Sequence, residues 1–192
     1  MEKLLYIDAC IRDELSRTKK IANPIINKLK EKFDVTTLVL NELNLQIVLK
    51  DEITRRNNKI IPQEVLNWAN LIKNADRIVI SAPFWDMSIP AALKNFLELC
   101  SIFDVTFSSN EKTCYGLCKA SNLLFITTRG MNIKTGDSLE QATPYIKALS
   151  WLWGIKNVEV LAAENFDYLP EDVINKQIEI KIQEGLKLIE SF

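Results

Sequence analysis

The chain has 192 residues, 47% of them hydrophobic, which is enough to bury one core within a single domain. Its 24 lysines and arginines nearly balance its 25 aspartates and glutamates, so no basic field is available to hold a nucleic-acid backbone. The sequence has no apolar run of about 20 residues and no hydrophobic leader at its start, so we expect a cytoplasmic protein without membrane contact.

Strand and helix signals alternate along the whole chain. Contiguous apolar runs predict strands, and apolar residues at intervals of three and four predict helices. In chain order the expected elements are a strand over Lys3–Asp8, a helix through Ile21, Ile25, Leu29 and Phe33, a strand over Val35–Leu40, a helix over Gln63–Asn74, a strand over Arg77–Ala82, a helix over Ile89–Cys100, a strand over Leu123–Thr128, a helix over Ser138–Trp153, a strand over Val158–Ala163 and a helix over Pro170–Glu190.

Two regions are harder to interpret. Residues 41–61 are polar and irregular, which indicates a loop with a short helix, and Arg55, Arg56 and Lys59 are expected on a solvated loop. The first helix has two possible starts, one at Ser16 and one at Asn23–Pro24. If it starts at Ser16, Pro24 lies inside the helix and should kink it.

Apolar strands separated by helices are typical of a parallel sheet covered on both faces. Five such strands predict a flavodoxin-like three-layer α/β sandwich, with strand order 2-1-3-4-5 and a ligand at the switch point beside strands one and three. We expect residues 1–192 to form one domain, with an insertion at 103–119. Within it, Val105–Phe107 and Tyr115–Leu117 can form a small hairpin or flap.

The absence of histidine limits the possible chemistry. Serine–histidine and cysteine–histidine nucleophile pairs are excluded. Cys10, Cys100, Cys114 and Cys118 are expected as reduced thiols, and they lack the partners that a zinc site needs. If the protein is an enzyme, a bound group other than a protein imidazole must perform the reaction.

The loop after the first strand has the features of an anion site. It contains no glycine, which excludes both the dinucleotide-binding fingerprint and the Walker A loop. Ser16 can cap the following helix, so that free amides and the hydroxyls of Ser16 and Thr18 face an anion, with Arg12 and Arg17 adding positive charge. A terminal phosphate monoester fits such a loop. An ordinary helix cap without a ligand remains the alternative.

Two further loops should meet this one at the same edge of the sheet. In Pro83–Met87, backbone groups can bond the edge of a planar heterocycle while Phe84 or Trp85 covers it, although a packed aromatic corner is equally possible. Thr128, Arg129 and Gly130 follow the fourth strand, where a glycine lets the backbone approach a flat ligand. An ordinary turn is the alternative there.

The sequence resembles the family of FMN-dependent NADH-azoreductases and NAD(P)H:quinone oxidoreductases, which have a flavodoxin-like fold. The most specific match is the block from Ala82 to Asn95. The other matching segments are spread over most of the chain and occur in the order found in the family. They are Ser16-Arg17-Thr18, Val105-Thr106-Phe107, Gly116-Leu117, Thr127-Thr128-Arg129-Gly130, Thr143-Pro144-Tyr145 and Gly154-Ile155.

The resemblance implies a set of cofactor contacts. It places the FMN phosphate against Ser16, Arg17 and Thr18, and the isoalloxazine ring against Pro83–Met87 and Thr128–Gly130. Two positions depart from the family pattern. Cys10 stands where family members usually have serine or another small polar residue, and Met131 stands where many have a second glycine. The resemblance puts both of these residues at the cofactor as well, and it implies a homodimer with two sites at the subunit interface.

The activity implied by the resemblance is electron transfer through FMN. NADH or NADPH would reduce the flavin, and a quinone, azo or nitro compound would then take two electrons at the same place in a ping-pong cycle. Backbone donors of Asp86–Met87 and Arg129–Gly130 would stabilise charge on the reduced ring, and Phe103, Phe107 and Trp153 would line the substrate pocket. Two alternatives remain open. One is a flavin-binding electron carrier or redox sensor, and the other is a flavin-free interaction protein of the same fold.

Overall fold

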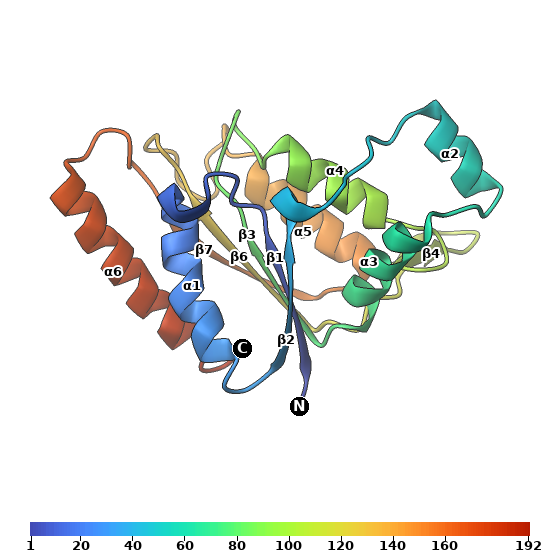
Figure 1. Cartoon of the computed structure of the whole chain (residues 1–192), viewed down its shortest axis with the longest axis horizontal. Helices are drawn as coiled ribbons and strands as arrows, with labels where there is room; N and C mark the ends of the chain where they lie inside the picture. The colour runs from blue at the N-terminus through green and yellow to red at the C-terminus, as the bar shows by residue number, and fades with distance from the viewer.

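The computed structural model describes all 192 residues and has a central sheet between two layers of helices (Figure 1). Its strands are all parallel and pair in the order β2-β1-β3-β6-β7. They are β1 (Lys3–Asp8), β2 (Asp34–Val39), β3 (Arg77–Ser81), β6 (Asn122–Thr128) and β7 (Asn157–Ala163). The expected five-stranded parallel sheet is confirmed. The labels read 2-1-3-6-7 rather than 2-1-3-4-5 because the two strands of a separate hairpin come between β3 and β6.

The helices are divided between the two faces of the sheet (Figure 1). They are α1 (Arg17–Leu29), α2 (Lys50–Asn57), α3 (Gln63–Asn74), α4 (Ala91–Cys100), α5 (Ala142–Trp153) and α6 (Glu171–Leu188). Helices α1 and α6 cover one face, and α3, α4 and α5 cover the other, while α2 projects from the body. No helix combines the length and the apolar character needed to cross a bilayer.

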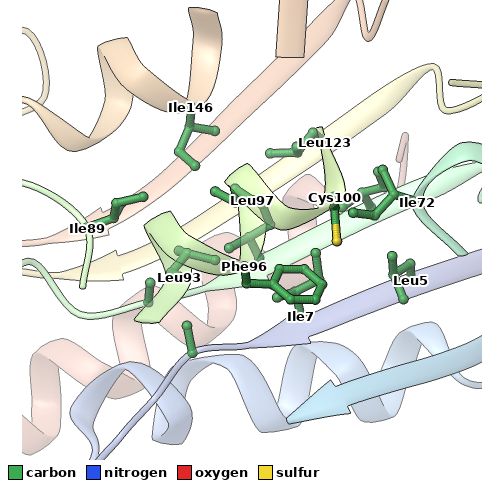
Figure 2. Packing of buried hydrophobic residues seen from close by; sticks show 14 of the residues in the cluster. Leu5, Ile7, Ile72, Ile89, Leu93, Phe96, Leu97, Cys100, Leu123 and Ile146 are labelled. Atoms are coloured by element: carbon green, nitrogen blue, oxygen red, sulfur yellow. The ribbon is translucent and has the colours of Figure 1, made fainter. Parts of the chain in front are cut away.

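Alternate residues of β1 contribute to two separate hydrophobic clusters. Leu5 and Ile7 pack on the side of α3, α4 and α5, whereas Leu4 and Tyr6 pack on the side of α1 and α6. Figure 2 shows Phe96 of α4 reaching toward Ile7 in the first of these clusters. Both faces of the three central strands β1, β3 and β6 are buried, and these strands therefore read as nearly continuous apolar runs in the sequence.

Helix α1 begins directly after Ser16. The Ser16 hydroxyl accepts a hydrogen bond from the Lys19 amide at 3.2 Å, which identifies Ser16 as the N-cap. The helix continues through Pro24, so the alternative start at Asn23–Pro24 does not occur. Proline has no amide hydrogen, and the Lys20 carbonyl one turn earlier therefore lacks its usual helical partner.

The insertion holds a short antiparallel hairpin of β4 (Phe107–Ser109) and β5 (Cys114–Gly116). Gly116 lies directly on the end of α5, where a β carbon at that position would come within 1.9 Å of the Trp153 carbonyl carbon. Only a glycine permits this approach, which fixes the hairpin against the body of the protein.

The segment between β2 and α3 departs from expectation, because Arg55 and Arg56 both lie on α2 and only Lys59 follows the helix. Arg56 does not lie on a solvated loop but on α2, and its guanidinium donates to the carbonyls of Glu98 at 3.1 Å and Leu99 at 3.0 Å. These carbonyls lie in the last turn of α4, where free acceptors and the helix dipole favour a cation. Arg56 thereby connects α2 to α4, and it also pairs with Glu52 of its own helix at 3.2 Å.

Candidate functional site

The loops after β1, β3 and β6 meet around a cavity of about 260 Å³ at the carboxyl edge of the sheet. Parallel strands direct these loops to one edge, and the switch in strand order between β1 and β3 leaves room between them. The lining residues are Arg12, Leu15, Ser16, Arg17, Thr18, Pro83, Phe84, Trp85, Thr128, Gly130 and Asp167. Wider grooves exist, such as one of about 700 Å³ beside Tyr115 and Trp151, but that groove does not lie among these three loops.

One part of the cavity, which we call the anion end, consists of Arg12, Ser16, Arg17, Thr18 and Thr128. The N-terminus of α1 lies at this end of the cavity. The Ser16 hydroxyl accepts from the Lys19 amide, whereas the Arg17 and Thr18 amides have no acceptor within the helix. Thr18 and Thr128 share a hydrogen bond of 2.6 Å between their hydroxyls, which joins α1 to the end of β6. Free amides, hydroxyls and a helix N-terminus are the groups that bind phosphate in proteins.

The charge at the anion end is positive. Arg12 and Arg17 contribute two positive charges, and Asp167 is the acidic residue in the cavity lining. Arg17 Nη1 donates to Asp167 Oδ1 at 3.3 Å, and the Arg17 guanidinium carbon lies 5.6 Å from the centre of the Phe166 ring. An anion of charge −1 or −2 is therefore the ligand that this end favours.

The other part of the cavity, the turn end, is lined by Pro83, Phe84 and Trp85, and Trp85 is the first residue of the tight turn Trp85–Ser88. Trp85 and Ser88 exchange backbone hydrogen bonds of 2.9 and 2.8 Å. The two residues between them, Asp86 and Met87, have φ angles of +47° and +66°. Consecutive positive φ angles define a turn type that normally takes asparagine or glycine, so a methionine there carries backbone strain.

Backbone hydrogen bonds to other segments fix the turn, while the Trp85 ring stays partly exposed. The Met87 carbonyl accepts from the Gln141 amide at 2.9 Å, and the Phe84 amide donates to the Thr128 carbonyl at 3.0 Å. Trp85 is 40% exposed, whereas Phe84 is buried. A flat ligand can therefore lie against the turn without displacing a core residue.

A buried charge network supports the turn end. Arg129 has no exposed surface, and its guanidinium lies 3.6 Å from Glu140, 3.5 Å from Glu164 and 5.5 Å from the centre of the Phe84 ring. Burial lowers the pKa of Arg129, and the two glutamates oppose that shift. Glu140 also accepts from the Ala142 and Thr143 amides at the start of α5. The network therefore fixes the segment between β6 and α5.

Beneath the first loop lies a second buried group of polar side chains. Tyr6 and Ser81 share a hydrogen bond of 2.8 Å, and the Cys10 amide donates to Asp8 at 2.9 Å. Burial, followed by the charge of Asp8, raises the pKa of the Cys10 thiol to about 12. Cys10 therefore stays protonated at neutral pH and has the properties of a small packed residue rather than a nucleophile.

Most of the residues expected at a cofactor line the cavity, but some do not. The exceptions are Cys10, Asp86, Met87, Arg129 and Met131. The Cys10 side chain is buried, whereas Met87 and Met131 are partly exposed but do not line the cavity. Arg129 was expected to contact the cofactor, but its side chain is fully buried. Its amide already donates to the Ala163 carbonyl at 2.8 Å.

The residues expected to line a substrate pocket are also placed differently. Trp153 has no exposed surface, and its indole N–H donates to the Ser101 hydroxyl at 3.2 Å, so it is a core residue and not a pocket wall. Phe103 is 53% exposed and meets Phe107 edge to face at 5.8 Å. Neither phenylalanine lines the cavity within a single chain.

Sequence reasoning missed two lining residues, Leu15 and Asp167. Leu15 is 71% exposed in the short helical turn before Ser16, where no pattern distinguishes it from a loop residue. Asp167 follows the last strand of the sheet by a few residues. The signal that could have found it is topological, because the loop after β7 also ends at the carboxyl edge.

The residues that line the cavity offer groups for a phosphate at one end and for a planar ring at the other. FMN has this form, and two observations support the fit. The anion end supplies positive charge and a helix N-terminus, and the turn end supplies exposed aromatic surface with positive-φ backbone beside it. No side chain in the lining is a histidine or cysteine, so the lining itself offers no nucleophile–base pair.

Comparison with known proteins identifies the family to which the chain belongs. A family model described as "Flavodoxin-like fold" matches residues 2–186. An FMN-dependent NADH:quinone oxidoreductase 2 of Clostridium acetobutylicum is 30% identical over 182 residues, which are 90% of this chain and 91% of that protein. An FMN-dependent NADH:quinone oxidoreductase of Clostridium perfringens is 27% identical over 195 residues, which are 97% of this chain and 96% of that protein.

A solved structure shares the fold. The crystal structure of an azoreductase from Bacillus anthracis superposes with a TM-score of 0.88 at 22% sequence identity, and the match covers 100% of both chains. At this identity the structural likeness establishes the arrangement of strands and helices alone.

Proposed function

The chain belongs to the flavodoxin-like fold family, and from this premise we propose that it is an FMN-dependent NAD(P)H oxidoreductase that reduces quinones and azo compounds. The observation that carries the proposal is the cavity at the carboxyl edge, where a helix N-terminus, two arginines and an aromatic turn come together. The relatives described as FMN-dependent NADH:quinone oxidoreductases match nearly the full length of the chain, which supports the same activity.

In this proposal the anion end holds the FMN phosphate. The amides of Arg17 and Thr18 and the hydroxyl of Ser16 donate to phosphate oxygens, and the Arg12 and Arg17 side chains neutralise their charge. Thr128 contributes indirectly, because its hydrogen bond with Thr18 fixes the side chain on α1. The phosphate thus anchors the cofactor from the side of β1.

The turn end holds the isoalloxazine ring. Pro83, Phe84 and Trp85 lie along the cavity, and the backbone amides of the strained Asp86–Met87 pair donate to no acceptor within the chain. Gly130 borders the same space from the β6 side. Amides fixed in this way can donate to the ring and stabilise negative charge on it, and their strain is already present before the ligand arrives.

FMN supplies the redox chemistry when it is bound, so the chain needs no acid, base or nucleophile of its own. The protein's task is to bind, orient and shield. We infer that NADH or NADPH and the acceptor, a quinone, azo or nitro compound, use the same space beside Trp85 in turn, which is a ping-pong order. Trp85 and Met87 are 40% and 36% exposed and offer apolar surface to both partners.

We also propose that the protein acts as a homodimer. The cavity is open on the side of the exposed aromatics, and within one chain neither Phe103 nor Phe107 reaches it. A second subunit that brings its hairpin and Phe103 to this opening completes a pocket wall. Phe103, exposed to 53% in the single chain, is an aromatic residue of the type that is enriched in interfaces.

The test combines spectroscopy with turnover. The purified protein is expected to carry, or to be reconstituted with, one FMN per chain and then to oxidise NADH or NADPH steadily when a quinone is added. Flavin binding without steady turnover favours an electron carrier or sensor. A colourless protein that FMN does not reconstitute contradicts the proposal and favours a flavin-free interaction protein.

A further inference from the structure

Beside the anion end, the cavity lining contains a carboxylate that a phosphate site does not need. Asp167 lines the cavity together with Arg12 and Arg17, and its Oδ1 accepts from Arg17 Nη1 at 3.3 Å. The Asp167 side chain is 62% exposed and that of Arg17 is 38% exposed. One of the two cations that face the cavity is therefore already paired with an internal anion.

The position of Asp167 is determined by its neighbours. Its amide donates to the Gly130 carbonyl at 2.9 Å, which ties the loop after β7 to the loop after β6. A β carbon on residue 130 would lie 1.8 Å from Asp167 Oδ2, so the carboxylate occupies space that the glycine leaves free. Phe166 supports Arg17 from the other side, with the guanidinium 5.6 Å from its ring centre.

We propose that Asp167 competes with the ligand phosphate for Arg17 and thereby sets how much the phosphate adds to flavin affinity. The inference rests on the proposed FMN site, but it concerns a residue that the phosphate contacts do not include. When a phosphate enters the anion end, Arg17 must either leave Asp167 or bridge two anions. In both cases the carboxylate reduces the net attraction for a phosphate.

The physical scale of this competition is modest but measurable. An exposed arginine–carboxylate pair contributes little to stability, so a phosphate can displace it. The like-charge repulsion remains after displacement, because Asp167 is bonded through its amide to Gly130 and stays in the cavity lining. Arg12 makes no ion pair and is left to attract the phosphate without competition.

The test compares two flavins that differ only in the phosphate. Flavin-free protein is titrated with FMN and with riboflavin, and the dissociation constants are obtained from flavin fluorescence. Asp167→Asn keeps the size and exposure of the side chain but removes its charge. We expect the FMN dissociation constant to fall about fivefold and the riboflavin constant to change less than about twofold.

Two further variants make the result specific. Asp34→Asn removes an exposed aspartate at the start of β2, at the opposite edge of the sheet, and should leave both constants unchanged. In an Arg17→Gln background the fivefold gain from Asp167→Asn should shrink to less than about twofold, because the contested cation is gone.

The outcomes separate the two proposals. If the original protein binds FMN but Asp167→Asn leaves that affinity unchanged, weakens it, or tightens both flavins equally, the inference on Asp167 is overturned while the flavin site stands. A gain that persists in full without Arg17 also overturns it. If neither the original protein nor the variant binds either flavin, the proposed function fails, and the inference fails with it.

Discussion

The two ends of the cavity differ in their chemistry. At the anion end, the start of α1 supplies hydroxyls, amides and positive charge. At the turn end, the loop after β3 supplies an aromatic surface and a strained turn. The anion end is built from ordinary helix capping, with Ser16 bonded to the Lys19 amide and Thr18 bonded to Thr128. The turn end places Asp86 and Met87 at positive φ, a conformation that costs free energy.

The difference teaches that the two ends should fail in different ways. Changes at the anion end should affect ligands that carry a phosphate, and they should leave phosphate-free flavins bound as before. Changes at the turn end should affect both kinds of flavin equally, because the ring is common to them. Changes in the buried support behind the turn should affect the stability of the fold itself.

The largest effect is expected from the support behind the turn end. Arg129→Met removes the cation between Glu140 and Glu164 and leaves the fully buried Glu140 and the partly exposed Glu164 without their partner. The free energy of unfolding should fall by about 3–5 kcal/mol, measured by denaturant titration. A loss below about 1 kcal/mol, the scale of an exposed pair, would contradict the description of a buried network.

At the anion end, a matched pair of substitutions separates charge from capping. Asp and Asn cap helices as well as Ser does, so Ser16→Asp and Ser16→Asn should both preserve α1. Ser16→Asp places a negative charge against the phosphate and should weaken FMN binding by about 100-fold, with little change for riboflavin. Ser16→Asn should have a much smaller effect. Equal losses in the two variants would show that charge at this position is unimportant.

At the turn end, Trp85→Ala tests the ring contact. Trp85 is 40% exposed, so its removal should leave the fold intact while weakening FMN and riboflavin alike, each by about tenfold. Trp151→Ala is the control, because Trp151 is 64% exposed beside a different groove. A loss confined to FMN would place Trp85 at the phosphate and invert the assignment of the two ends.

The smallest effect concerns the strain in the turn. Met87→Gly removes the β carbon from a residue at φ +66° and should raise the free energy of unfolding by up to about 1 kcal/mol. Met87→Ala keeps the strain and removes only the side chain, so it should not stabilise. If thermal unfolding ranks the alanine variant above the glycine variant, the turn is not strained in solution.

Much of the fold could be predicted because its signals are local or topological. The apolar runs gave β1 with both ends correct and the other strands to within one residue, and the periodicity gave α3 as Gln63–Asn74. Parallel strands then brought the loops together without any further information. The N-cap at Ser16 was also readable, since a serine before a helical pattern is a local signal.

What failed depends on contacts between residues distant in the sequence. The sequence does not distinguish the environments of Trp153 and Trp85. In the structure Trp153 is buried and donates to the Ser101 hydroxyl, whereas Trp85 is 40% exposed. Arg56 was wrongly expected in solvent. The α4 carbonyls that it binds lie more than 40 residues later in the chain, so no local pattern indicates the contact. Asp167 was missed because its role arises from Arg17, at a separation of 150 residues.

The most direct test is a crystal structure of the protein with FMN bound. The account predicts the phosphate at the N-terminus of α1, in contact with Ser16 and Arg17, and the ring against the Trp85–Ser88 turn. Flavin located elsewhere, for example in the groove beside Tyr115 and Trp151, or with its phosphate away from α1, would contradict it.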